Sequence, residues 1–153
     1  MSKIAVTVSS KVQAPAAIVY NILADYSHHR NILPPRFFIG LDIIEGGVGE
    51  GTRFVLHANS LGGAKKQMHM AVTEPKPGSV LVERDENTDL VTTFSVEPVG
   101  TAVCDVTFET VWQPQPGFKG IIDRWTTPFL MRMVYRQEQK ILDEYARQLV
   151  RLS

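Results

Sequence analysis

Hydrophobic residues alternate with polar ones at the start of the chain and recur with helical spacing at its end. Between Lys3 and Val12 nearly every second residue is apolar, which is typical of a β-strand with one buried face. From Phe118 to Leu152 apolar residues lie three, four and seven positions apart, as in an amphipathic helix. These patterns predict an N-terminal strand and a C-terminal helix roughly 50 Å long.

Two short helices and a series of hairpins are predicted between these ends. Pro15 suits the first turn of a helix, and the apolar stripe from Ile18 to Leu23 predicts a helix that ends near Asp25. A second helical piece is expected over 27–32, before the two prolines that follow Leu33. From 36 to 111, short apolar runs alternate with Gly- and Pro-containing turns, which predicts an antiparallel meander of six strands.

Pairing the predicted hairpins by the length of their turns gives the sheet one apolar face. The turns place Leu56 opposite Met68, Phe54 opposite Met70, Met70 opposite Val82, Val82 opposite Thr92, and Phe94 opposite Cys104. The apolar face then carries Phe54, Leu56, Met68, Met70, Val72, Val80, Val82, Leu90, Phe94, Val96, Cys104, Val106, Phe108 and Trp112. The polar face carries Arg53, His57, Gln67, His69, Glu83, Asp85, Thr93, Glu97, Asp105 and Glu109. A shift of one residue in any pairing would turn a strand's side chains to the other face.

The apolar face of such a sheet needs a cover, and the C-terminal helix is the one predicted element large enough. We therefore expect an α+β fold with a curved seven-stranded antiparallel sheet wrapped around the long C-terminal helix, and two short helices after the first strand. The chain fits one domain over residues 1–153. Sheet and helix enclose either a filled core or a cavity, and the Met and Phe residues of the apolar face favour a ligand-lined wall.

Composition and charge exclude several classes of function. Hydrophobic residues make up 44% of the chain and charged residues 21%, which is typical of a globular domain. Lys and Arg number 16, as do Asp and Glu, so we expect no nucleic-acid partner. No apolar segment approaches the ~20 residues of a membrane span, and no signal-peptide pattern is present. We therefore expect a cytoplasmic protein without an integral membrane segment.

Three conspicuous motifs predict neither a metal nor a cofactor. The Gly-rich loop at 46–51 lacks the Gly-Lys-Ser/Thr ending of a phosphate loop and precedes a strand. His28 and His29 point in different directions and lack an acidic residue or Cys at metal-ligand spacing, which favours a solvated loop. The lone Cys104 lies in a strand pattern, which favours a buried apolar residue over a reactive thiol.

Short motifs follow one another in a recognisable order along the whole chain. They are Ala-Pro at 14–15, Leu-Ala-Asp-Tyr at 23–26, Leu-Pro at 33–34, the Gly-rich turn at 45–52, and Gly-Ile-Ile-Asp-Arg at 120–124. With the order of strand, helix pair, meander and long helix, they resemble the START-like superfamily. This superfamily includes polyketide cyclase/dehydrase and lipid-transport proteins and the Bet v 1-like plant proteins. The resemblance implies the helix-grip fold, which hosts carriers, receptors, cyclases and subunits of larger systems.

Arg84 is the charged residue that the predicted pairing places on the apolar face. It would bind a ligand carboxylate, phenolate or carbonyl, extend to the rim of the sheet, or pair with a helix carboxylate such as Asp123. Three other polar residues are expected to face the interior: Thr92, Thr110 and Tyr135. Their hydroxyl groups would orient one end of a ligand. Trp125, Phe129 and Met133 form a stripe on the long helix, where the resemblance implies the cavity wall nearest its mouth.

Three functions fit these features. The first is binding of an apolar small molecule, such as a lipid, polyketide or quinone, by a monomer or weak homodimer. Its expected contacts are Phe54, Leu56, Met68, Met70, Val82, Arg84, Thr92, Phe94, Phe108, Thr110, Trp125, Phe129 and Met133. The second is a cyclase or aromatase, in which Arg84 and Tyr135 would act as acid or oxyanion partner, since no inward Asp, Glu or His is expected. The third is an accessory subunit of a larger system.

Overall fold

The computed structural model describes residues 2–59, 65–114 and 118–153, and the side chains of 118–126 lie outside the described set. The elements are β1 (Ile4–Val12), α1 (Ala16–Ala24), α2 (Tyr26–His29), β2 (Phe38–Glu45), β3 (Arg53–Asn59), β4 (Lys65–Lys76), β5 (Val80–Asp85), β6 (Val91–Pro98), β7 (Cys104–Trp112) and α3 (Phe118–Leu152). The strands form one antiparallel seven-stranded sheet in the order β1-β7-β6-β5-β4-β3-β2. The helix-grip fold predicted from the sequence is confirmed, although α2 is shorter than the expected 27–32 segment.

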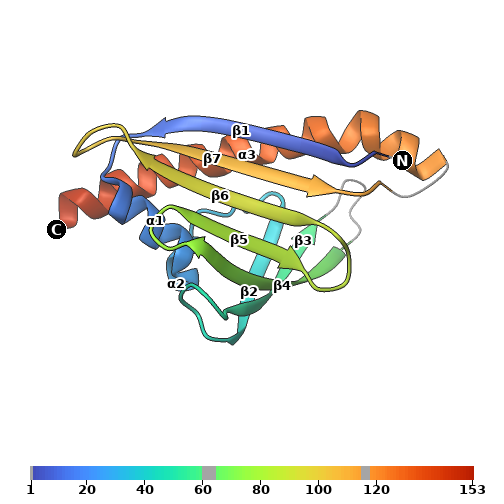
Figure 1. The fold of residues 1–153 in the computed structure, drawn as a ribbon, viewed down its shortest axis with the longest axis horizontal. Helices are drawn as coiled ribbons and strands as arrows, with labels where there is room; N and C mark the ends of the chain where they lie inside the picture. Colours follow the sequence, from blue (N-terminus) through green and yellow to red (C-terminus); the bar gives the residue numbers. More distant parts are fainter. Residues whose placement is uncertain (1, 60–64, 115–117) are drawn as a thin grey trace.

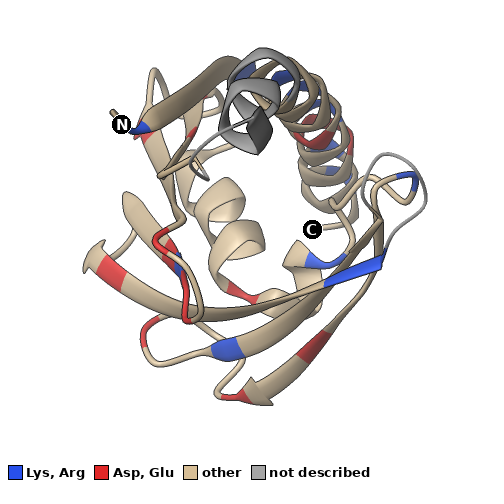
Figure 2. Ribbon diagram, turned by 90° about the vertical axis from the view of Figure 1, so that its right-hand side faces the viewer, with Lys and Arg blue, Asp and Glu red and all other residues tan. Residues whose placement is uncertain are grey.

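The sheet curves around α3, and the short helices close one end of the space between them (Figures 1 and 2). Leu142 and Ala146 of α3 are fully buried, as are Ile22 and Leu23 of α1. Gln139 of α3 donates a hydrogen bond from Nε2 to the carbonyl oxygen of Val8 in β1, at 2.8 Å. This side-chain bond to a strand backbone fixes α3 along the sheet edge in addition to apolar packing.

Three of the predicted strand pairings are wrong, and the errors on the two sides of β5 change which of its residues face inward. Val82 of β5 pairs with Thr93 and not with Thr92. Leu56 pairs with Met68 as predicted. Met70, however, pairs with Asp85 and not with Val82, a difference of three positions. The turn itself lies elsewhere, since Lys76 pairs with Val80, and the difference is odd because β4 has a register irregularity of one residue between Thr73 and Lys76. An extra residue of this kind turns the following side chains to the other face of the sheet.

The corrected register exchanges the two faces of β5. Leu81, Glu83 and Asp85 point inward and are buried, whereas the predicted inward residue Arg84 is exposed. Between β6 and β7, Phe94 pairs with Phe108 and not with Cys104. That difference of four positions changes the partners but leaves the faces as predicted.

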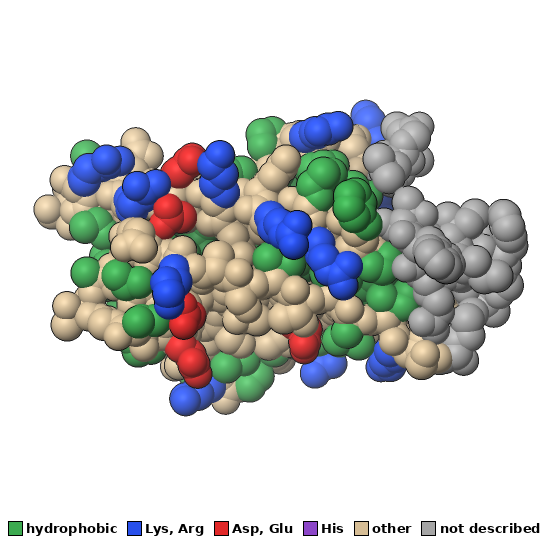
Figure 3. Space-filling model, turned by 90° about the horizontal axis from the view of Figure 1, so that it is seen from above, with side chains coloured by type: hydrophobic (Ala, Val, Ile, Leu, Met, Phe, Trp, Pro, Cys, Tyr) green, Lys and Arg blue, Asp and Glu red, His purple; other side chains and the backbone are tan. Residues whose placement is uncertain are grey.

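Charged side chains lie mainly on the outer surface. Figure 3 shows Lys and Arg along the face seen from above, interspersed with acidic and hydrophobic side chains. Lys11 on β1 pairs there with Asp105 on β7 at 3.0 Å, and both side chains are about half exposed. Such exposed pairs contribute little to stability, so the fold depends on the apolar interior.

Replacement of Phe108 by Ala is expected to lower the free energy of unfolding by about 3–5 kcal/mol, because the ring is fully buried. The same change at Phe129, whose residue is 72% exposed, is expected to cost less than about 0.5 kcal/mol. Urea unfolding monitored by circular dichroism compares the two variants. Equal losses in both would contradict the placement of Phe108 in the core.

Candidate functional site

A cavity of about 190 Å³ lies between the inner face of the sheet, the segment after α2, and α3. Its wall is mostly apolar and includes Phe54, Leu56, Met68, Met70, Phe94, Leu130 and Val134. Imidazole and carboxyl groups reach it from three elements: His29 of α2, Glu83 of β5 and Glu138 of α3. An apolar enclosure with a few convergent polar groups is the usual form of a small-molecule site.

Many of the residues expected at a ligand site do line this cavity. They are Phe54, Leu56, Met68, Met70, Thr92, Phe94, Thr110 and Tyr135. Phe108 lies behind the wall, where its ring packs edge-on against Phe94 and Tyr135. The predicted helix stripe is mostly off the wall: Phe129 is exposed, Met133 is not a lining residue, and the Trp125 side chain lies outside the described residues.

Arg84 and Val82 do not line the cavity. The β4 irregularity turns Arg84 to the outer face of β5, where it is exposed, and Val82 is buried on the same outward-facing side. The prediction that Arg84 faces the interior is therefore wrong. Among the described lining residues, no Lys or Arg is present.

Three hydroxyl groups form a chain on the cavity wall. Thr92 Oγ1 lies 2.8 Å from Thr110 Oγ1, which is in turn hydrogen-bonded to the hydroxyl of Tyr135. Burial raises the pKa of Tyr135 well above its ordinary value of 10, although its bonds to the two threonines lower it. Tyr135 is therefore a neutral phenol near neutral pH, and this chain can orient a ligand oxygen or nitrogen by hydrogen bonding.

His29 is held in one orientation at the inner end of the cavity. Its Nδ1 donates to the carbonyl oxygen of Leu23 at 2.8 Å, since a carbonyl can only accept. The ring stacks on Tyr26 at 4.9 Å and meets the edge of Phe94 at 5.5 Å. Its Nε2 consequently lies 3.6 Å from Glu138 Oε1. The prediction of a solvated histidine loop is wrong for His29, because α2 turns this side chain inward.

Glu83 is the second carboxyl group at this end. Its Oε2 accepts a hydrogen bond of 2.5 Å from the hydroxyl of Tyr26. Burial raises the pKa of Glu83 above its ordinary value of 4.5, and the charge of His29 and the bond from Tyr26 offset this only in part. Burial lowers the pKa of His29, but its contact with Glu138 and the charges of Glu83 and Glu138 raise it overall above 6.5.

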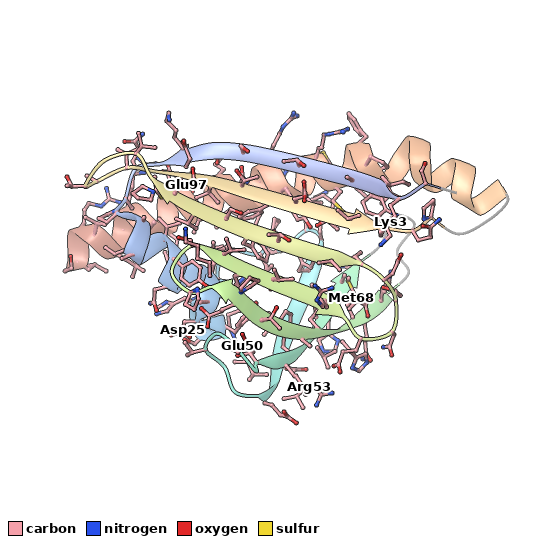
Figure 4. All side chains as sticks on the ribbon, viewed as in Figure 1. Lys3, Asp25, Glu50, Arg53, Met68 and Glu97 are labelled. Carbon is pink, nitrogen blue, oxygen red and sulfur yellow. The ribbon has the colours of Figure 1, made fainter. Side chains whose placement is uncertain are left out.

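The Gly-rich loop at 46–51 positions α2 through backbone hydrogen bonds. The backbone N–H of Tyr26 donates to Gly47 O at 2.8 Å, and Gly49 N donates to Ala24 O at 2.9 Å. Figure 4 labels Asp25 and Glu50 near one another, where this loop meets the end of α1. The loop therefore fixes the helix that carries Tyr26 and His29.

Sequence reasoning missed His29, Glu83 and Glu138, although one signal was available. Glu138 lies four positions after Val134 and three before Ile141, within the apolar stripe of α3. A carboxylate in a buried stripe requires a partner and often marks a functional site. For Glu83 the β4 irregularity hides the inward direction, and for His29 only the three-dimensional position of α2 reveals it.

Residues 3–149 match the family of polyketide cyclase/dehydrase and lipid-transport proteins. The chain belongs to this family. The match covers every described strand and almost all of α3, in agreement with the resemblance found in the sequence. No curated protein compared by sequence matches the chain.

Solved structures with the same fold as this family member include proteins of different kinds. The KanY protein is 24% identical, with a TM-score of 0.82 over 96% of this chain and 99% of its own. The ZhuI aromatase/cyclase from Streptomyces sp. R1128 is 17% identical, with a TM-score of 0.72 over 97% and 96%. Ginseng major latex-like protein 151 from Panax ginseng is 12% identical, with a TM-score of 0.71 over 94% and 97%. At these identities the likeness shows the fold alone.

The described residues contain neither a membrane-spanning helix nor a metal-binding cluster. No helix among them is long and apolar enough to cross a bilayer. Within the same part of the chain, no group of three His, Cys, Asp or Glu side chains has an arrangement that would hold a metal ion.

Replacement of Glu83 by Gln is expected to reduce the loss of stability as pH rises. The folded pKa of Glu83 lies above 4.5, so its contribution is complete below pH 4.5 and is lost as pH rises through the folded value. As pH rises above 4.5, the free energy of unfolding of Glu83→Gln should therefore fall less than that of the wild type. Urea unfolding at a series of pH values measures the difference.

Glu97→Gln provides the matched control for this experiment. Glu97 is exposed on β6, and Figure 4 shows it far along the sheet from the cavity residue Met68. The free energy of unfolding of the Glu97→Gln variant should equal that of the wild type at every pH. A Glu83→Gln curve parallel to the wild type would show that burial does not perturb this carboxyl group.

Proposed function

We propose that this protein binds an apolar small molecule in the cavity between the sheet and α3, with one polar group of the ligand at the inner end. The observation that carries this proposal is the cavity itself: about 190 Å³, mostly apolar, with His29, Glu83 and Glu138 at its wall. A family of cyclases and lipid-transport proteins is consistent with such a ligand.

The volume favours a ligand body of one or two rings or a short chain. A cavity of about 150 Å³ in another protein is sufficient to bind benzene. The present cavity is somewhat larger, and the half-buried Leu56 and Met68 in its wall have side chains that can adjust to a larger body. Aromatic probes with a short polar tail are therefore suitable test ligands.

Replacement of Leu56 by Trp is expected to lower the affinity for such a probe by about tenfold or more, because the indole would fill the cavity. Val55→Trp introduces the same side chain on the other face of β3 and should change the affinity less than about twofold. Isothermal titration with 2-phenylethanol, supported by native mass spectrometry, measures both. Equal affinities in the two variants, with thermal unfolding confirming that both are folded, would place the ligand elsewhere.

A second candidate function is a proton-transfer reaction of the cyclase/dehydrase type. The arrangement that favours it is the His29–Glu138 pair on the cavity wall, since such chemistry needs a positioned acid and base. In dehydration of a β-hydroxy ketone, Glu138 would take the proton from the carbon beside the carbonyl. His29 would protonate the leaving hydroxyl, which departs as water, and a carbon–carbon double bond forms.

With 4-hydroxy-4-phenylbutan-2-one as substrate, the absorbance of the conjugated enone product would report turnover. His29→Gln is expected to lower the rate by about 10²-fold or more, and Glu97→Gln should leave it unchanged. A wild-type rate no higher than that of buffer would remove this candidate for this substrate class and leave ligand binding as the function.

A further inference from the structure

The polar end of the cavity has more carboxyl groups than the described residues can balance with positive charge. His29, Glu83 and Glu138 are 2%, 7% and 3% exposed and all line the cavity. His29 is the single basic side chain among the described lining residues. An anionic ligand group would meet two carboxyl groups here and no free cation.

The geometry of His29 and Glu138 assigns one proton to this pair. Nδ1 of His29 carries a hydrogen because it donates to Leu23 O, so Nε2 is the atom that faces Glu138. Two lone pairs facing each other at 3.6 Å would repel, so a proton is held on one of the two groups. The contact with Glu138 favours the imidazolium form of His29, and this ion pair has no net charge.

Among the described lining residues, Glu83 is then the carboxyl group without a cation of its own, because His29, the one basic group, already faces Glu138. Its hydrogen-bond partner is the phenol of Tyr26, which donates a bond but carries no charge. The neighbouring Arg84 points away from the cavity, and Tyr135 on α3 is a neutral phenol. A buried carboxylate in this position either takes up a proton or requires a cation.

The rings of Phe54 and Phe94 pack against Tyr26 and His29, the neighbours of this carboxyl group, and favour the second solution. Phe54 and Phe94 both line the cavity, and they contact Tyr26 and His29 at 4.6 and 5.5 Å. Aromatic faces attract a desolvated cation, and N–H donors match carboxylate oxygens. The carboxylate oxygens and the aromatic rings of this wall therefore both suit a cation that carries N–H groups.

We infer that the ligand of this cavity carries a protonated amine, which binds between Glu83 and Glu138 against the rings of Phe54 and Phe94. This inference rests on the proposed ligand-binding function and specifies the polar end of the ligand. It also reverses the polarity expected from the sequence, where an inward Arg84 predicted an anionic or carbonyl group. In the complex Glu83 is a carboxylate that pairs with the amine.

Three probes of similar size test the inference by isothermal titration at pH 7. They share a phenyl ring and differ in the polar group: 2-phenylethylamine is a cation, 2-phenylethanol is neutral, and phenylacetate is an anion. The amine is expected to bind about tenfold more tightly than the alcohol, and phenylacetate more weakly than either.

Variants then locate the preference within the cavity. Glu83→Gln and Glu138→Gln keep the shape of the side chain and are each expected to reduce amine affinity about tenfold, with the alcohol within about threefold of the wild type. Glu97→Gln should bind all three probes as the wild type does. Since the probe comparison itself uses only the wild-type protein, it stands even if one variant fails to fold.

The outcomes separate this inference from the proposed function. If the alcohol binds and the amine binds no more tightly, or phenylacetate binds best, the inference is wrong and the apolar ligand site stands. If the amine preference persists unchanged in both Gln variants, the carboxyl groups do not recognise the ligand and the inference is also wrong. If none of the three probes binds, the proposed function fails and the inference falls with it.

Discussion

The hydrogen bond from Tyr26 to Glu83 connects the parts of the molecule on which the candidate site depends. A carboxyl group on the inner face of a sheet loses its hydration, and it persists there only with a hydrogen-bond partner. Tyr26 supplies that partner from α2, 57 residues earlier in the chain. The same phenol ring stacks on His29, whose Nε2 faces Glu138 on α3. One interaction thus orients polar groups from the short helices, the sheet and the long helix toward one cavity.

The Gly-rich loop has a structural task that explains its composition. Gly49 has a φ of +63°, and a Cβ at this position would lie 2.1 Å from Glu74 Oε1. Glu74 cannot move away freely, because its Oε1 accepts from the backbone N–H of Glu50 and its Oε2 from the hydroxyl of Tyr20. The glycine therefore permits the close approach of loop and strand that holds the end of α1 and the start of α2 in place.

The fold could be predicted from the sequence because strands and helices with one buried face leave local patterns of apolar residues. Over long segments these patterns distinguish a strand from a helix. The sequence also placed the side chains of β3, β4, β6 and β7 on the correct faces, including Phe54, Met70 and Thr92. The prediction of faces failed at β5, because a single irregularity in the neighbouring β4, between Thr73 and Lys76, exchanges the inward and outward residues of β5. Turn length alone does not reveal such an irregularity, and the error replaced an inward Glu83 by an inward Arg84. The position of His29 depends on α2 docking, which no local pattern records.

The free energy needed to bury His29, Glu83 and Glu138 is itself evidence about function. Apolar residues of similar volume at positions 29, 83 and 138 would avoid the desolvation of three ionisable groups, and such replacements are often neutral or stabilising. The fold has no need of these groups to close its core, because α3 and the short helices already bury Leu142, Ile22 and Leu23. Tyr26 and the Leu23 carbonyl each hold one member of the cluster in a fixed direction. Groups that are costly to bury, individually oriented and directed at one cavity are better explained by what they bind than by what they stabilise.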